Sequence, residues 1–347
     1  PEADVTVVDH VKLFRNRPDV RFEGRIHEQL LPSIRGGAGE LAWTDLYVVH
    51  SGSDQGAAAQ ERKRERDLRI LARELAERPG HPFTLFNLGM TYVDGSQFQD
   101  GAEHLRASIA AAGENESHLR KAYALLAYAV MQLGRKDEAR EVLHKARRLF
   151  PQDVELRFRE GVLLHDLGRL EEAVQAYHDV LTIREERHFT SVDRGIGGFK
   201  ARQNLAVVLT DLGRLEEAAA QWRLVIDEMP EYRPGWRGLA DLQLGRGALD
   251  EAGRLADAMD QTPALQLEAC LLRSRLAAAQ GDSAAVRAWC DRAIAIDSDD
   301  AEAMQWSCQV LFEHGATEEA REALERLLAR FPDDAAALHN LGTLHLR

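Results

Sequence analysis

The sequence predicts a mostly α-helical fold of stacked helical hairpins, preceded by a short β-rich segment. A glycine recurs in a similar short turn at a fixed spacing; these residues are Gly134, Gly168, Gly213, Gly247, Gly281 and Gly315. Four of the five spacings are 34 residues, and the fifth, from Gly168 to Gly213, is longer by 11. A fixed period of this length indicates helical hairpins that stack on one another. The first fifty residues do not follow the period.

The composition fits this fold and narrows the class of partner. The 347 residues are 45% hydrophobic, 29% charged and 6% aromatic, which is typical of a helix-rich globular chain. The formal net charge is −13. Binding to a phosphate backbone requires clustered Lys and Arg, so we expect no nucleic-acid partner. The charge is compatible with a basic peptide as partner.

The cysteines and the two ends of the chain give three further expectations. Cys270, Cys290 and Cys308 fall at helical positions without metal-ligand spacing, which predicts core thiols in a reducing, cytoplasmic compartment. No apolar run reaches 18 residues and no signal peptide is visible, so we expect no transmembrane segment. The chain begins with Pro1 and ends within a hairpin at Arg347, which suggests a piece of a longer protein.

The N-terminal part has strand and loop character. Thr6–Val8, Val11–Phe14 and Tyr47–Val49 are short β-rich runs, separated by stretches with Pro and Gly. From about residue 60, leucines recur at helical spacing among Arg and Glu. We therefore assign residues 1–52 to the end of a β-rich domain and residues 53–81 to a linker helix.

Residues 82–347 align as repeats with a shared pattern of large and small side chains. Small residues such as Gly161 and Ala218 recur where two helices of a hairpin must approach closely. The period and the pattern are those of the tetratricopeptide repeat, which predicts a superhelical solenoid. An insertion near residues 184–200 contains Gly195–Gly198. We interpret it as a helix extension; the alternative is a phosphate-binding loop, for which a preceding strand is missing.

Four sequence elements occur in a fixed order near the N-terminus: Lys12-Leu13-Phe14-Arg15-Asn16, then Phe22-Glu23-Gly24-Arg25-Ile26-His27-Glu28, then His50-Ser51-Gly52, and then Pro82-Phe83 with Asn87-Leu88-Gly89. This order resembles the end of the catalytic domain in bacterial family 2 glycosyltransferases that carry C-terminal tetratricopeptide repeats. The resemblance covers residues 11–110 closely and the repeats more loosely. Two departures are Lys12-Leu13-Phe14 in place of an Arg-x-Phe start and Ser53 or Gln55-Gly56 where the family often has Tyr.

The resemblance implies that residues 1–52 are the β-rich C-terminal remnant of an α/β nucleotide-sugar transferase domain. In such enzymes a divalent metal, Mn²⁺ or Mg²⁺, neutralises the diphosphate of the nucleotide-sugar donor. The resemblance places His27 and His50 at the metal and Glu28 in a catalytic role. The alternative is that the His27-Glu28 pair only caps a helix starting at Gln29, and that His50 is a surface residue.

The first helices of the repeats offer a second candidate site. Asparagines stand two residues before the small residue of three first helices, at Asn87, Asn204 and Asn340. Such a row can face an inner groove, where amide side chains donate to and accept from an extended peptide backbone. We therefore expect a protein or peptide in the repeat groove. The alternative is that these asparagines are solvated or packed.

Two functions follow from these observations. The first is the C-terminal part of a metal-dependent glycosyltransferase, whose repeats recruit an acceptor or partner. The alternative is a non-enzymatic tetratricopeptide-repeat scaffold for protein–protein interaction. The chain has no credible Asp-x-Asp metal pair, because Asp297-Ser298-Asp299 falls in a turn where such residues cap helices. We expect the chain alone to hold no metal or nucleotide-sugar and to turn over no donor.

Overall fold

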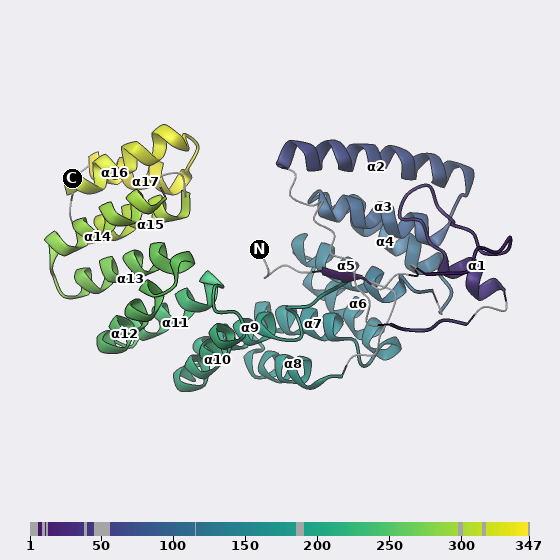
Figure 1. Ribbon diagram of the computed structural model, residues 1–347, viewed down its shortest axis with the longest axis horizontal. Coiled ribbons are helices and arrows are strands. Elements are labelled where there is room, and N and C mark those ends of the chain that lie inside the picture. Colours follow the sequence, from purple (N-terminus) through teal and green to yellow (C-terminus); the bar gives the residue numbers. More distant parts are fainter. Residues whose placement is uncertain are drawn as a thin grey trace. The chain divides into compact units, whose positions relative to one another are not determined.

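The computed structural model describes residues 6–8, 11, 13–37, 40–44, 56–114, 116–184, 191–297, 301–313 and 317–345. Within these ranges the chain forms seventeen α-helices, one short 3-10 helix and two three-residue strands (Figure 1). Contacts divide the chain into two compact units, Pro1–Val208 and Leu209–Arg347. The boundary falls inside the helix Phe199–Asp211.

The first unit begins with a short strand and a short helix, and then consists of long helices. Its elements are β1 (Thr6–Val8), α1 (Leu31–Gly36), α2 (Ala57–Glu77), α3 (Pro82–Asp94), α4 (Phe98–Ala111), α5 (Leu119–Gln132), α6 (Lys136–Leu149), α7 (Val154–Asp166), α8 (Leu170–Thr182), β2 (Ser191–Asp193) and the start of α9 (Phe199–Asp211). The pairs α3/α4, α5/α6 and α7/α8 are antiparallel hairpins, and successive hairpins also touch through their first helices.

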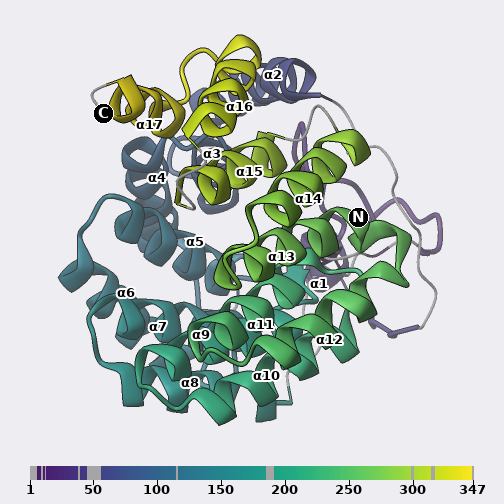
Figure 2. The same ribbon diagram turned by 90° about the vertical axis from the view of Figure 1, so that its left-hand side faces the viewer.

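The second unit repeats the same hairpin design. Its elements are α10 (Leu215–Glu228), α11 (Arg233–Gly245), α12 (Leu249–Asp260), the 3-10 helix Pro263–Leu265, α13 (Gln266–Ala279), α14 (Ser283–Ile296), α15 (Ala301–Glu313), α16 (Thr317–Arg330) and α17 (Ala335–His345). The pairs α11/α12, α13/α14 and α15/α16 form hairpins (Figure 2). Contacts between α11 and α13, and between α13 and α15, again join successive first helices.

The recurring glycines follow the first helices α5, α7, α9, α11 and α13. Gly134, Gly168, Gly213, Gly247 and Gly281 all have φ between 71° and 76°. This left-handed conformation is least costly for glycine, and it reverses the chain towards the second helix. The predicted turn role of these five glycines is confirmed; Gly315 lies outside the described residues.

The small residues of the repeat allow close contact between the helices of a hairpin. A Cβ atom at Gly161 would lie 2.8 Å from the ring of Tyr177, on the facing helix α8. Ala139 and Ala173, which begin the second helices of their hairpins, are fully buried. The cores of both units are therefore lined with alanines beside larger side chains such as Leu and Val, as the repeat pattern predicts.

The expected β-rich remnant of an α/β domain is wrong. The described part of residues 1–52 contains one three-residue strand, one helix and irregular segments, and the chain is an all-α repeat array apart from two short strands. β1 pairs with β2, which lies in the insertion between α8 and α9. The insertion is also not a helix extension, since it contains this strand and a turn. Short β-branched runs form strands only where a partner strand is available, and in the described part of the chain β1 and β2 are the two strands that pair.

Candidate functional site

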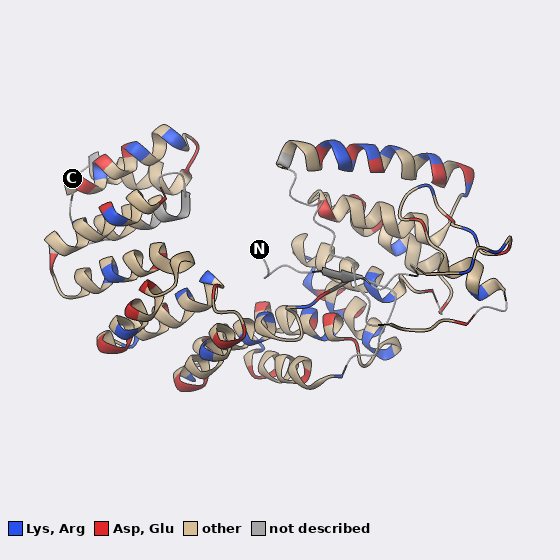
Figure 3. Ribbon diagram, in the orientation of Figure 1, with Lys and Arg blue, Asp and Glu red and all other residues tan. Residues whose placement is uncertain are grey.

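The N-terminal segment is attached to the long helix α2. Glu23 and Gln29 exchange two backbone hydrogen bonds of 2.9 Å, which close a turn. From this turn the Arg25 backbone N–H donates to Glu74 (3.1 Å), and its guanidinium donates to Glu77 (2.6 Å). Both acceptors lie on the last turns of α2, a helix along which acidic and basic side chains are interspersed (Figure 3). The turn thus caps the start of the helical array.

The two candidate residues His27 and Glu28 lie exposed on this turn. His27 has φ of 55°, which is uncommon for a residue other than glycine. Partial loss of water lowers the pKa of its imidazole, while Asp67 on α2 opposes that change. Neither residue caps a helix at Gln29, because α1 begins at Leu31 and no side chain caps it.

The proposed metal site cannot be assembled from the described residues. His50 lies outside them, so its distance from His27 is not defined. Within the described ranges, no three side chains of His, Cys, Asp or Glu come together in a group able to hold a metal ion. The roles of His27, Glu28 and His50 therefore stay predictions. In the same part of the chain, no helix combines the length and apolar character needed to cross a bilayer.

Charged side chains join the first helices α5 and α7 of the first unit. Lys121 Nζ lies 2.7 Å from Glu155 Oε2, and Arg159 lies 3.2 Å from the other oxygen of the same carboxylate. Burial raises the pKa of Glu155, but Lys121 and Arg159 more than offset this and hold it below its usual range. The guanidinium of Arg159 also lies 4.7 Å from the ring centroid of Tyr128, a cation–π distance.

An apolar row follows the same first helices. In the first helices α3, α5, α7 and α9 the residue directly after the small repeat residue is hydrophobic; these residues are Met90, Tyr128, Val162 and Val207, hereafter the first-helix row. The first three are half-buried, and Val207 is 38% exposed. Sequence reasoning missed this row. The repeat alignment that located the asparagines could have found it, because the row stands three residues after the asparagine position in these helices.

The structure places the three asparagines in different environments. Asn87 is 2% exposed in α3, so a ligand reaches it only if neighbouring side chains move. Asn204 is half-buried, and its side-chain amide donates to the Lys200 carbonyl one turn earlier (2.8 Å). Asn340 is half-buried in α17. Their proposed role in peptide binding stays a prediction.

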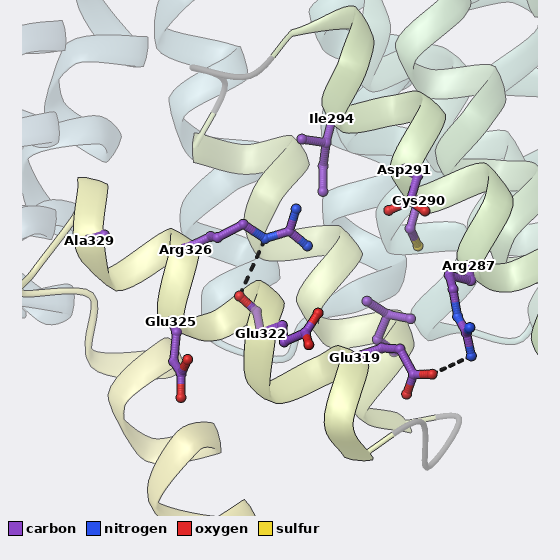
Figure 4. A pocket seen from close by; sticks show the side chains of 10 residues that line it. Arg287, Cys290, Asp291, Ile294, Glu319, Glu322, Glu325, Arg326 and Ala329 are labelled. Atoms are coloured by element: carbon purple, nitrogen blue, oxygen red, sulfur yellow. Dashed lines mark hydrogen bonds and ion pairs between the residues drawn. The ribbon is translucent and has the colours of Figure 1, made fainter.

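The second unit has a cleft between the second helices α14 and α16 (Figure 4). Its volume is about 630 Å³. Four carboxylates and two guanidiniums line it, and they belong to Asp291, Glu319, Glu322, Glu325, Arg287 and Arg326. Arg287 pairs with Glu319 across the cleft. The excess of carboxylates favours cationic groups, and the thiol of Cys290 at its wall is buried.

Two segments match models of the tetratricopeptide repeat family, residues 125–186 and residues 277–343. No curated protein matches the chain. Among solved structures, a tetratricopeptide repeat protein from Parabacteroides merdae is 15% identical, with a TM-score of 0.54 over 77% of this chain and 99% of its own.

Two other structures are similar at the same level. PilW, described as a widely conserved type IV pilus biogenesis factor, is 18% identical, with a TM-score of 0.50 over 76% of this chain and 98% of its own. A chain of the APC/C hetero-tetramer Cut9-Hcn1 is 15% identical, with a TM-score of 0.51 over 83% of this chain and 48% of its own. At these identities the similarity concerns the fold alone. The two family matches and the helical hairpins that recur through both units together show that the fold is a tetratricopeptide repeat array.

Proposed function

We propose that the chain is a scaffold that binds a segment of another protein along the first-helix row. The observation that carries this proposal is the exposure of Val207, which holds the same repeat position as three half-buried hydrophobic residues on the preceding first helices. Exposed and half-buried hydrophobic side chains of this kind gain free energy when a partner covers them. The partner segment therefore carries apolar side chains towards the row.

The charges beside the row support a rigid binding surface. Lys121, Glu155 and Arg159 satisfy one another, so the helices α5 and α7 keep their spacing without a ligand. A surface that is already ordered loses less conformational entropy on binding. The net charge of −13 favours a partner with basic residues flanking the apolar ones, because such residues speed the encounter.

A peptide selection with two matched variants tests the proposal. Peptides are selected from a displayed random library on the full chain, and the dissociation constant of the best peptide is measured. Val207→Asp then places a charge on the first-helix row, and Leu149→Asp makes the same change at a 45% exposed leucine on the second helix α6. We expect Val207→Asp to weaken binding about ten-fold or more, corresponding to about 1.4 kcal/mol, and Leu149→Asp to leave it unchanged. Equal effects of the two variants would overturn the proposal.

A second role rests on the N-terminal turn. His27 combines a left-handed backbone conformation with an exposed imidazole beside Glu28, and such strained residues cluster at functional sites. This supports a role of the turn in a glycosyltransferase of which the chain would be a part, with a divalent metal and a nucleotide-sugar as cofactor and donor. Donor hydrolysis is measured with the protein as encoded and with its His27→Ala variant. Unchanged activity of the variant removes His27 from the site.

A further inference from the structure

The insertion between α8 and α9 contains a strand that is paired with a distant part of the chain. β2 lies antiparallel to β1, with Thr6 opposite Asp193, Val7 opposite Val192 and Val8 opposite Ser191. These two strands form a separate two-stranded sheet. The N-terminal strand thus crosses from the start of the unit to a point between its later hairpins.

The turn that follows β2 is ordered by Asp193. One carboxylate oxygen accepts the backbone N–H of Gly195 (2.9 Å), and the other accepts the ammonium of Lys200 (2.6 Å). The carbonyl of Asp193 accepts the N–H of Ile196 (3.2 Å). A side chain that bonds to the backbone two residues later fixes a turn locally. The end of β2 is therefore held in place without help from β1.

The same turn is packed against the helices around it. Ile196 and Phe199 are buried, and a Cβ atom at Gly195 would lie 2.5 Å from the Phe199 ring. A Cβ atom at Gly197 would lie 3.9 Å from Val154, at the start of α7. The strand β2 is therefore attached to a rigid part of the first unit, on which an extended segment can dock.

The pairing that holds β1 on β2 is short. The pairing extends over three residue pairs. An isolated two-stranded sheet is at best marginally stable in water, and three pairs are fewer than an average strand provides. β2 is fixed by its own turn, whereas β1 is held on it by a short ladder. We therefore expect that another strand can replace β1 on the edge of β2.

We propose that β2 is a docking edge for an extended peptide strand, occupied in this chain by its own residues Thr6–Val8. The partner is an extended segment rich in β-branched residues, which aligns antiparallel to β2 and replaces β1. Main-chain hydrogen bonds give such strand addition its affinity, and β-branched residues suit the extended conformation. The docking edge consists of other residues than the first-helix row, so the two proposals are tested separately.

A peptide with the sequence of residues 3–10, Ala-Asp-Val-Thr-Val-Val-Asp-His, is the probe. In the wild-type chain the strand in cis competes with it. Val7→Pro breaks the cis pairing, because proline lacks the N–H and does not fit the middle of a ladder. If the cis strand occupies more than nine-tenths of the edges, the variant binds the labelled peptide about ten-fold more tightly than the wild type. A peptide with proline at its central valine is the control and should not bind.

The acceptor side is tested in the Val7→Pro background. Adding Val192→Pro should abolish peptide binding, while circular dichroism verifies that both variants keep their helix content. Peptide affinity that is equal in the wild type and Val7→Pro, or that survives Val192→Pro, overturns the proposal. Failure of the first-helix row to bind a peptide would not affect this result, because the docking edge is tested with a different peptide.

A disulfide measures the exchange directly in an otherwise unchanged chain. Val8 and Ser191 are opposite each other, and directly paired residues lie within disulfide reach. The double variant Val8→Cys and Ser191→Cys should form a cross-link that mass spectrometry identifies, and excess peptide should lower its yield. The natural thiols are buried and do not compete. No cross-link, or a yield that the peptide does not change, contradicts the docking edge.

Discussion

A buried imidazole at the start of α5 makes the stability of the first unit depend on pH. His118 is 2% exposed, and its ring packs 5.5 Å from Phe83 and 5.2 Å from Phe86, measured between ring centroids. Among the described residues, neither ring nitrogen has a hydrogen-bond partner, and Glu116 Oε2 lies 3.8 Å from Nδ1. Burial, with a smaller contribution from His81, lowers the pKa of His118 to about 4.

The sign and size of the effect follow from the two pKa values. In the unfolded chain the imidazole has its ordinary pKa of 6.5, so between pH 6.5 and 4 the unfolded chain binds a proton that the folded chain does not. Folding stability is therefore unaffected by His118 above pH 6.5 and decreases as the pH falls below it. At about 1.4 kcal/mol for each unit of pKa difference, the loss reaches about 3 kcal/mol near pH 4.

Denaturation in urea, followed by circular dichroism at several pH values, measures this loss against His118→Leu. Leucine keeps an apolar side chain in the site and removes the titration. As the pH falls from 7 to 4.5, the free energy of unfolding of the wild type should therefore decrease by about 2 kcal/mol or more beyond the decrease seen in the variant. His144→Leu, at an exposed position on α6, is the control for the change of residue type. If the wild type and His118→Leu lose stability in parallel as the pH falls, the reasoning about this imidazole is refuted.

Three further predictions concern packing, ion pairing and thiols. Gly161→Ala should lower the free energy of unfolding by about 1–3 kcal/mol through overpacking against the facing tyrosine ring, whereas Gly253→Ala, with open space around it, should be neutral or stabilising in the same thermal melts. Glu155→Gln should cost about 3 kcal/mol by leaving Lys121 without its partner, and the added change Lys121→Met should recover most of that loss. Burial raises the pKa of Cys308 to about 12, so this thiol should not react with a disulfide reagent at pH 8 until the chain is unfolded.

Much of the fold can be read from the sequence because the repeat depends on local requirements. A left-handed turn residue favours glycine, and a close helix crossing needs a small side chain, so Gly168 and Gly161 each identify their own structural role. The β-rich N-terminus could not be read in this way. Whether the valines of β1 form a sheet depends on the partners that the rest of the chain supplies, and within the described ranges that partner is β2.

The turn in the insertion could be predicted from local sequence, whereas the exposure of the binding surface could not. Asp193-x-Gly195 was a local turn signal that could have been recognised, since the carboxylate of Asp193 bonds to the Gly195 N–H. The exposure of a first-helix position, in contrast, depends on its neighbours in space. Asn87 and Asn204 hold the same repeat position, yet Asn87 is buried and Asn204 only half so. The repeat alignment therefore identified the relevant positions of the first helices, but it could not show which of them are accessible.

Photo-crosslinking at the first-helix row tests the central claim most directly. Benzoylphenylalanine replaces Val207 in one preparation and Leu149 in another, so that two exposed hydrophobic positions, on first helix α9 and second helix α6, are compared in the same unit. With the peptide selected on the wild-type chain, the account predicts a cross-linked product from position 207 and none from position 149. A product from position 149 alone would contradict the claim that this repeat array binds its partner through its first helices.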